Sequence, residues 1–219
     1  LEFRRVLFRS MHNDDVLKAA IDLSAKYGFN QNNTLFSHSV CPDEINHEDG
    51  DITDALAKHF TAIFTLGGLA GIPFSGSTGF GAYASHVPEG GNIFILFAPH
   101  CAVSIDGRCG YYKRFGQSKF STACGAGIGA WLAAKDMEEE PLVDIFQYDM
   151  QMGYIKNVMW KNKARIAAAE DQVAELTYVL YDHIEHYISE VVHKKNLIHH
   201  RMFILGGIQI NVTPDDYFE

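Results

Sequence analysis

Three residues of the sequence have the types and the settings that a catalytic zinc site needs. Cys41 directly follows a predicted strand, Thr34–Val40, and His100 follows a second, strongly apolar segment. Cys124 precedes a glycine that opens a predicted helix of small residues. Two thiolates and one imidazole form a known zinc ligand set, in which the fourth position is left to water or substrate. Because structural zinc sites usually take paired ligands from one short segment, this wide spacing favours catalysis.

Each of these residues also has an ordinary structural explanation. A cysteine such as Cys41 is most often a buried small apolar residue, and a single histidine such as His100 is often a hydrogen-bonded side chain. Cys124 lies at a predicted helix N-terminus, where the helix dipole favours the thiolate. A thiol hydrolase that uses Cys41 with His100 and Asp43 is a further alternative. It needs a free thiol and an oxyanion hole, so a tightly bound zinc ion would exclude it.

An acidic residue and an arginine are candidates for the groups around such a metal. Asp43 lies two residues after Cys41, where it could accept a hydrogen bond from a zinc-bound water or occupy the fourth ligand position itself. Its structural alternative is a turn residue. Arg108 and Arg114 lie between His100 and Cys124, and either could hold Asp43 ionised through a bidentate pair. We favour Arg114.

The order of the predicted elements indicates how these residues are positioned. Open α/β sheets place their sites at the carboxyl ends of strands, where Cys41 and His100 both lie. Strands and helices alternate along the chain, which predicts an α/β fold with a mostly parallel central sheet flanked by helices. The predicted strands are Thr34–Val40, Asn92–Pro99 and Met202–Val212. The predicted helices are Asp14–Tyr27, a helix from Asp51 or Thr53 through Leu56, Phe60, Ile63 and Phe64 to Gly67, Cys124–Lys135, and residues 163–194.

Two segments are predicted to lack regular structure. The glycine density of residues 67–91 is typical of tight turns, so we expect an ordered loop there. This loop lacks both glycine patterns that bind nucleotide phosphates after a strand. The acidic segment Met137–Pro141 is predicted to be an exposed turn.

Composition and charge exclude several classes of protein. The chain has 219 residues, of which 47% are hydrophobic and 21% are charged, so it is neither disordered nor of low complexity. The net charge of −9 makes nucleic acid and anionic membranes poor partners, and no apolar run is long enough to span a bilayer. Four cysteines are too few for a disulfide scaffold.

The first ten residues differ from the remainder of the chain. Residues 1–10 (LEFRRVLFRS) have the character of a non-native adaptor or cloning-derived segment ahead of Met11. We therefore expect a single zinc-binding domain over residues 11–219. The compartment is undetermined, and a plastid location stays open in case a native targeting peptide is missing.

Several long blocks resemble one known family. Together they cover most of the chain from about residue 34 onward, in matching order, and they resemble the limiting-CO2-inducible B/C protein family, also called theta-class carbonic anhydrases. The blocks are SHSVCPDEIN at 37–46, GGLAGIPFSGSTGFGAYASHVP at 67–88, APH at 98–100, DGRCGYYKRFGQS at 106–118 and STACGA at 121–126.

The resemblance implies a beta-carbonic-anhydrase-like fold, a homodimer and zinc held by Cys41, His100 and Cys124. The aspartate of the C-x-D-x-R arrangement falls on Asp43. The arginine position is occupied by Ile45, so an arginine from elsewhere, such as Arg114, must pair with Asp43. The implied activity is reversible hydration of CO2 to bicarbonate, in a CO2-concentrating mechanism. Because the family includes inactive members, the alternative is a catalytically silent assembly protein that binds zinc or bicarbonate.

Further residues receive weaker expectations. An apolar wall for CO2 and a substrate path are predicted at Phe74, Phe80, Tyr83 and His86. Cys101 and Cys109 are expected to be packing or structural thiols, because adjacent side chains on an extended segment point apart and Cys101 follows His100 directly. The helix histidines are expected to form a solvated face, and they are His183, His186 and His193.

Overall fold

A parallel sheet forms the centre of the molecule. The computed structural model describes residues 10–143, 148–194 and 197–219. The strand order in this sheet is β3 (Ile63–Thr65), β2 (Thr34–Val40), β4 (Asn92–Ala98) and β8 (Arg201–Gly206), and all of its pairings are parallel. The predicted α/β class with a mostly parallel central sheet is therefore confirmed.

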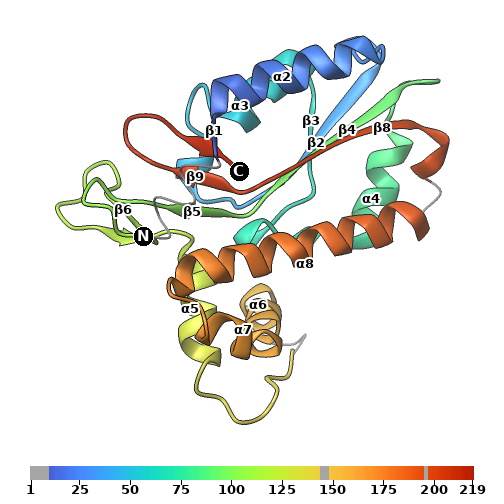
Figure 1. The fold of residues 1–219 in the computed structure, drawn as a ribbon. Helices are drawn as coiled ribbons and strands as arrows, with labels where there is room; N and C mark the ends of the chain where they lie inside the picture. Colours follow the sequence, from blue (N-terminus) through green and yellow to red (C-terminus); the bar gives the residue numbers. More distant parts are fainter. Residues whose placement is uncertain (1–9, 144–147, 195–196) are drawn as a thin grey trace.

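Helices cover both faces of the sheet, as Figure 1 shows. On one face lie α2 (Asn13–Lys26) and α3 (Ile52–Phe60). On the other face lie α4 (Gly76–Ser85) and the long α8 (Gln172–Lys194), and α8 separates the sheet from the remaining helices. These outer helices are α5 (Gly125–Ala134), α6 (Met150–Lys161) and α7 (Lys163–Ala167).

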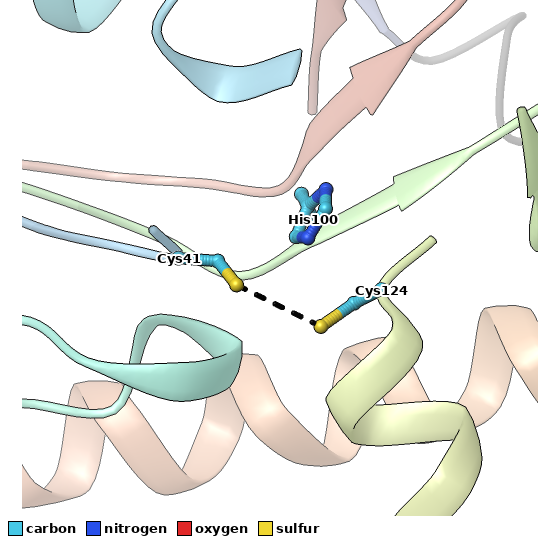
Figure 2. Close-up of side chains that lie close together, drawn as sticks. All are labelled: Cys41, His100 and Cys124. Carbon is cyan, nitrogen blue, oxygen red and sulfur yellow. Dashed lines mark hydrogen bonds between the residues drawn. The ribbon is translucent and has the colours of Figure 1, made fainter. Parts of the chain in front are cut away.

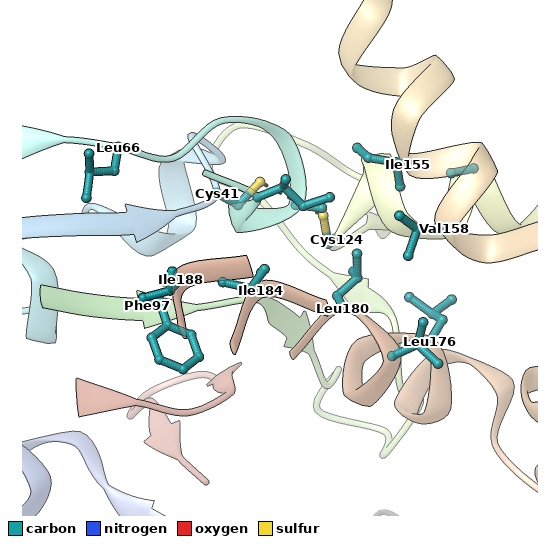
Figure 3. Packing of buried hydrophobic residues seen from close by; sticks show 14 of the residues in the cluster. Cys41, Leu66, Phe97, Cys124, Ile155, Val158, Leu176, Leu180, Ile184 and Ile188 are labelled. Atoms are coloured by element: carbon teal, nitrogen blue, oxygen red, sulfur yellow. Dashed lines mark hydrogen bonds between the residues drawn. The ribbon is translucent and has the colours of Figure 1, made fainter. Parts of the chain in front are cut away.

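The buried strands explain this layering. Every residue of β4 is buried, and successive side chains of a strand point to opposite faces. Phe94 and Leu96 pack with Phe36 toward α2 and α3. Ile93, Ile95 and Phe97 point the other way, into the core formed with α8. Figure 3 shows that Cys41 and Cys124 belong to this second core, beside Leu176, Leu180 and Ile184.

A second sheet extends the first and carries the candidate histidine. After Pro99, β4 continues as β5 (His100–Ala102), and after Gly207, β8 continues as β9 (Gln209–Asn211). The sheet order is β1 (Met11–His12), β10 (Tyr217–Phe218), β9 and β5, and β5 pairs with β9 in parallel. A short antiparallel pair, β6 (Tyr111–Tyr112) and β7 (Ser121–Thr122), leads into α5. The short 3-10 turns are Glu44–Asn46, Leu69–Gly71 and Leu197–His199.

The prediction of a helix from Asp51 or Thr53 to Gly67 is wrong for the second half of that segment. α3 ends at Phe60 because Thr61 adopts a left-handed conformation with a φ of 63°. Ile63 and Phe64 form β3 and pair with β2 instead. β-branched and aromatic residues such as Ile63 and Phe64 favour extended structure, and here they add a strand at the edge of the sheet.

The prediction of an irregular loop over residues 67–91 is also wrong in part. Residues 76–85 form α4 despite their glycines, because Phe80 and Tyr83 are fully buried on one face of the helix. Tertiary burial thus overrides the low helix propensity of glycine. The preceding turn does need glycine: a side chain at Gly67 would come within 2.8 Å of the Val40 backbone, and Gly71 has a φ of +79°.

Two predicted elements are divided in the structure. The helix expected over 163–194 is split into α7 and α8, and the Asp171 carboxylate accepts hydrogen bonds from the first amides of α8. The strand expected over Met202–Val212 is interrupted at Gly207 and Ile208, which separate β8, ending at Gly206, from β9. Phe97 and Phe218 rings occupy the space where side chains at these glycines would lie.

Three other expectations concern the first ten residues, the acidic turn and membrane-spanning helices. Of the predicted adaptor segment 1–10, all but Ser10 lies outside the described residues. The turn expected at Met137–Pro141 is exposed at Glu138, Glu139 and Glu140. None of the helices in the described part of the chain combines the length and hydrophobicity that crossing a membrane requires.

Candidate metal centre

The structure brings Cys41, His100 and Cys124 together from three separate elements. Cys41 directly follows β2, His100 is the first residue of β5, and Cys124 is the N-cap residue of α5. All three are buried, and their candidate ligand atoms lie within 4.8 Å of one another. Figure 2 shows the two sulfur atoms and the imidazole converging on one point. The parallel strands β2 and β4 end at the same edge of the sheet, which explains the meeting of Cys41 and His100.

The donor set fits a tetrahedral zinc ion. The Sγ atoms of Cys41 and Cys124 lie 3.9 Å apart. A disulfide needs about 2.05 Å between sulfurs, whereas two thiolates at about 2.3 Å from one tetrahedral zinc ion are about 3.8 Å apart. The separation therefore matches two ligands of a shared metal ion.

The imidazole of His100 is oriented by Asn211. Asn211 Nδ2 donates to Asp216 Oδ2 at 2.8 Å and to the Ile45 carbonyl at 3.0 Å, so its Oδ1 is the free acceptor. That oxygen lies 2.9 Å from His100 Nδ1, which consequently carries the proton. His100 Nε2 is buried and has no hydrogen-bond partner among the described residues. An imidazole held in this way presents an unprotonated nitrogen to a metal.

Asp43 and Arg114 form an ion pair at the mouth of the site. Arg114 Nη2 donates to Asp43 Oδ2 at 2.6 Å, and Arg114 Nε donates to Glu44 Oε1 at 2.7 Å. The same guanidinium also contacts the Ser121 hydroxyl and the Thr122 carbonyl. Asp43 Oδ1 is buried without a hydrogen-bond partner among the described residues. Burial opposes ionisation of Asp43, but the hydrogen bond from Arg114 and the nearby positive charge hold its pKa below the ordinary value.

The two sulfurs share one proton in the absence of a metal. A hydrogen bond from Cys124 lowers the pKa of Cys41 to about 4, and the same contact together with burial raises the pKa of Cys124. Burial lowers the pKa of His100, but the nearby Cys41 sulfur and the hydrogen bond with Asn211 outweigh it, so the pKa is raised overall. A bound cation would displace these protons, as metals do at thiolate sites.

A pocket of about 250 Å³ is lined by Cys41 and Cys124. A pocket of about 400 Å³ lies elsewhere, between His12, Asp51 and Asp216. The residues that line the smaller pocket are Cys41, Pro42, Asp43, Glu44, Leu69, Arg114, Thr122, Cys124, Gly125 and Ala126. Apolar and charged groups thus share its wall, and Asp43 lines it together with Cys41 and Cys124.

The four residues predicted to line a substrate path do not line this pocket. Phe80 and Tyr83 are fully buried in the core, where the Tyr83 hydroxyl donates to the Leu35 carbonyl at 2.6 Å. Phe74 packs on Tyr154. His86 is exposed and packs on Phe64. α4 turns Phe80 and Tyr83 toward the sheet, so these two residues contribute packing instead. Leu69 and Ala126 supply the apolar wall of the pocket.

The expectation for the helix histidines is correct only in part. His186 and His193 are exposed, but His183 is half-buried and its Nε2 lies 3.0 Å from the Tyr154 hydroxyl. Burial lowers the pKa of His183. His183 therefore joins α8 to α6 and does not belong to a solvated face.

Comparison with known proteins agrees with this geometry. A family model described as limiting CO2-inducible proteins B/C beta carbonic anhydrases matches residues 10–219. The chain belongs to this family. PtLCIB4, a homologue of the limiting CO2-inducible protein LCIB, is 28% identical, with a TM-score of 0.87 over 95% of this chain and 87% of its own. LCIB is 19% identical and shares the fold, with a TM-score of 0.68 over 95% and 86%. None of the curated proteins matches the sequence.

Membership of the limiting CO2-inducible protein B/C family confirms the resemblance seen in the sequence blocks, and with it the beta-carbonic-anhydrase-like class of the fold. Sequence reasoning missed Leu69 and Ala126, which line the pocket, and Asn211, which orients His100. Asn211 lies 111 residues from His100, and no local pattern marks an asparagine near the end of the chain as the partner of that imidazole.

Proposed function

We propose that the chain is a zinc-dependent carbonic anhydrase that catalyses reversible hydration of CO2 to bicarbonate. The observation that supports this most strongly is the unpartnered Nε2 of His100 facing two thiols, beside the unpartnered carboxylate oxygen of Asp43. Cys41, His100 and Cys124 would hold the ion, and their sulfur and nitrogen atoms are the donors that zinc prefers. Bound zinc supplies an acidified water as the nucleophile.

Asp43 would hold the hydrogen of the attacking water. Its Oδ2 is occupied by Arg114, so only Oδ1 is free to accept. An ionised acceptor in this position orients the oxygen lone pair of the water toward CO2 and disfavours anions that carry no proton. Arg114 keeps the acceptor charged and aimed, because its other nitrogens are bound to Glu44 and to the backbone of Thr122.

The pocket supports an uncharged, small substrate. Its volume of about 250 Å³ exceeds what CO2 needs, and Leu69, Pro42 and Ala126 provide apolar contact. The polar side, with Arg114 and Thr122, suits a product that carries a negative charge. Entry of CO2 and departure of bicarbonate would thus use the same opening.

The family also guides three broader parts of the proposal. Residues 11–219 would form one zinc-binding domain. The protein would be a homodimer, and it would act in a CO2-concentrating mechanism. A plastid location belongs to the same proposal and requires a targeting peptide ahead of residue 11.

Stopped-flow CO2 hydration tests the activity, with zinc quantified in the same sample. We expect activity in the zinc-loaded chain, and loss of about 10²-fold or more in Asp43→Asn with zinc retained. Glu44→Gln is the matched control, because Glu44 also pairs with Arg114 but is largely exposed. Zinc-loaded protein without activity would overturn the proposal in favour of a silent zinc- or bicarbonate-binding assembly protein.

A further inference from the structure

The two cysteines outside the metal centre form a second thiol pair. Cys101 lies in β5, and Cys109 lies across a hairpin in which Val103 and Cys109 form an antiparallel bridge. Two backbone hydrogen bonds close this hairpin, from Ser104 N to the Arg108 carbonyl at 3.0 Å and from Gly110 N to the Ala102 carbonyl at 2.7 Å. Since side chains alternate along a strand, residues 101, 103 and 109 share one face of the hairpin.

The two thiols lie in one apolar cluster. Cys101, Val103, Ile208 and Ile210 are its buried members, and Cys109 packs against them. Cys101 is 4% exposed, whereas Cys109 is partly exposed and gives a reactant access to the pair. Cys101 also lines a small cavity beneath α8.

This surrounding does not suit a metal ion. Within the described ranges, Cys41, His100 and Cys124 form the group whose ligand atoms could hold one, and the second pair does not belong to it. Two thiols with apolar neighbours lack the third and fourth ligands that zinc requires. Two adjacent sulfurs outside a metal site are instead suited to forming a covalent bond with each other.

We propose that Cys101 and Cys109 are a dithiol modification site that is oxidised to a reversible intramolecular disulfide. With a peroxide as oxidant, one thiol attacks the peroxide to give a sulfenic acid and water. The other thiol attacks that sulfur, the S–S bond forms, and a second water leaves. Each sulfur gives up one electron, and the peroxide takes up both. A disulfide-bonded partner protein could accept the same two electrons by thiol exchange.

The hairpin between the cysteines is short, and the bridge between Val103 and Cys109 keeps Cys109 close to the strand that carries Cys101. Its tip is solvent-exposed, with Ile105 87% exposed, and Gly107 adopts a φ of +82°. The bond would fasten the hairpin to the strand that begins with His100. It would also place the oxidation away from Cys41 and Cys124, which would hold the zinc ion of the proposed function. The proposal concerns thiol chemistry and does not depend on CO2 turnover.

Peptide mapping of the zinc-loaded full chain tests the site. The chain is treated with hydrogen peroxide, its remaining thiols are blocked with N-ethylmaleimide, and it is digested with trypsin. Lys58, Arg108 and Lys119 separate the cysteines, so each of the four lies in its own tryptic peptide. We expect the Cys101 and Cys109 peptides to be cross-linked, with dithiothreitol reversing the link and zinc content unchanged.

Two other results would overturn the proposal. One is a Cys41–Cys124 cross-link with zinc release as the first product, and the other is sulfinic acid on either cysteine with no cross-link. Cys109→Ser is the matched variant, because Cys109 is partly exposed and serine preserves its size. It should abolish the cross-link, and Cys101→Ser should leave a sulfenic acid on the partly exposed Cys109 that dimedone labels. A cross-link between other cysteines at wild-type yield would also contradict the assignment.

Discussion

The imidazole of His100 donates from Nδ1 to the side-chain oxygen of Asn211 over 2.9 Å. Asn211 is in turn held by Asp216 and by the Ile45 carbonyl, so the partly buried Asp216 carboxylate, the buried amide and the buried imidazole form one hydrogen-bonded network. Through these hydrogen bonds, Asn211 in the second sheet sets the orientation of His100, which follows β4 of the central sheet. Because β5 and β9 are paired in register, Asn211 lies opposite the Ala102 backbone and reaches His100 from the neighbouring strand.

Removing the Asn211 acceptor should weaken zinc binding. Asn211→Ala leaves His100 Nδ1 without its acceptor, so the imidazole is free to rotate or to change tautomer. We expect zinc affinity, measured by competition with a chromophoric chelator, to fall about 10- to 100-fold. Asn157→Ala is the control, since Asn157 bonds to the exposed Glu140. Equal affinity in Asn211→Ala and wild type, with similar stability of the metal-free proteins, would contradict the positioning role.

The two arginines between His100 and Cys124 should differ sharply in importance. Arg114→Gln removes the group that keeps Asp43 ionised and aimed, so CO2 hydration should fall about 10²-fold while zinc is retained. Arg108→Gln should leave the rate unchanged, because Arg108 pairs with the exposed Asp106. Both variants are compared by stopped-flow kinetics at matched zinc content. A similar loss in the two variants would show that charge in this segment matters, and not the contact with Asp43.

Local rules were sufficient to predict that Cys41, His100 and Cys124 come together. Cys41 and His100 lie where predicted strands end, and Cys124 lies where a predicted helix begins, so their meeting at one sheet edge follows from the fold class. The pair between Asp43 and Arg114 was also predicted, and the structure contains it. Asn211 was not, because pairing between β5 and β9 depends on contacts more than a hundred residues apart.

Side-chain direction was the other part that the sequence could not supply. Phe80 and Tyr83 were predicted to wall a substrate path, but they face the sheet because α4 packs on it. The glycines of residues 67–91 concealed that helix, and burial of these two rings outweighs the glycine propensities. Likewise, Thr61 has no side chain typical of a left-handed residue, so the end of α3 was placed too late.

The core beneath the metal centre should be sensitive to cavities. Leu180 on α8 is fully buried in the same cluster as Cys41 and Cys124, as Figure 3 shows. Leu180→Ala should lower the free energy of unfolding by about 2–5 kcal/mol. Leu132→Ala on α5 is the matched control, because Leu132 is 58% exposed and its loss should cost little. Urea unfolding of the metal-free proteins measures both; equal effects would place Leu180 outside the core.

Asp51 should make stability depend on pH. In the folded chain burial, and then the charge of Asp216, raise the pKa of Asp51 from 3.8 to about 7. Between these two values the folded state binds more protons than the unfolded state. The free energy of unfolding therefore falls as the pH rises from about 4 to about 7, and the loss is complete above that range.

Asp51→Asn carries no charge at any pH and should lack this contribution, while its side-chain oxygen still accepts the hydrogen bond from the Glu48 amide that Asp51 receives. The free energy of unfolding of the variant minus that of wild type should grow through this window and then stay constant, as measured by urea unfolding at fixed ionic strength. Asp54→Asn is the control: a hydrogen bond from Lys58 lowers the pKa of Asp54, so its stabilising effect is present above about pH 5 and is lost only on further acidification. A flat difference for Asp51→Asn between pH 4 and 7 would show that Asp51 ionises in the folded chain as it does in the unfolded one.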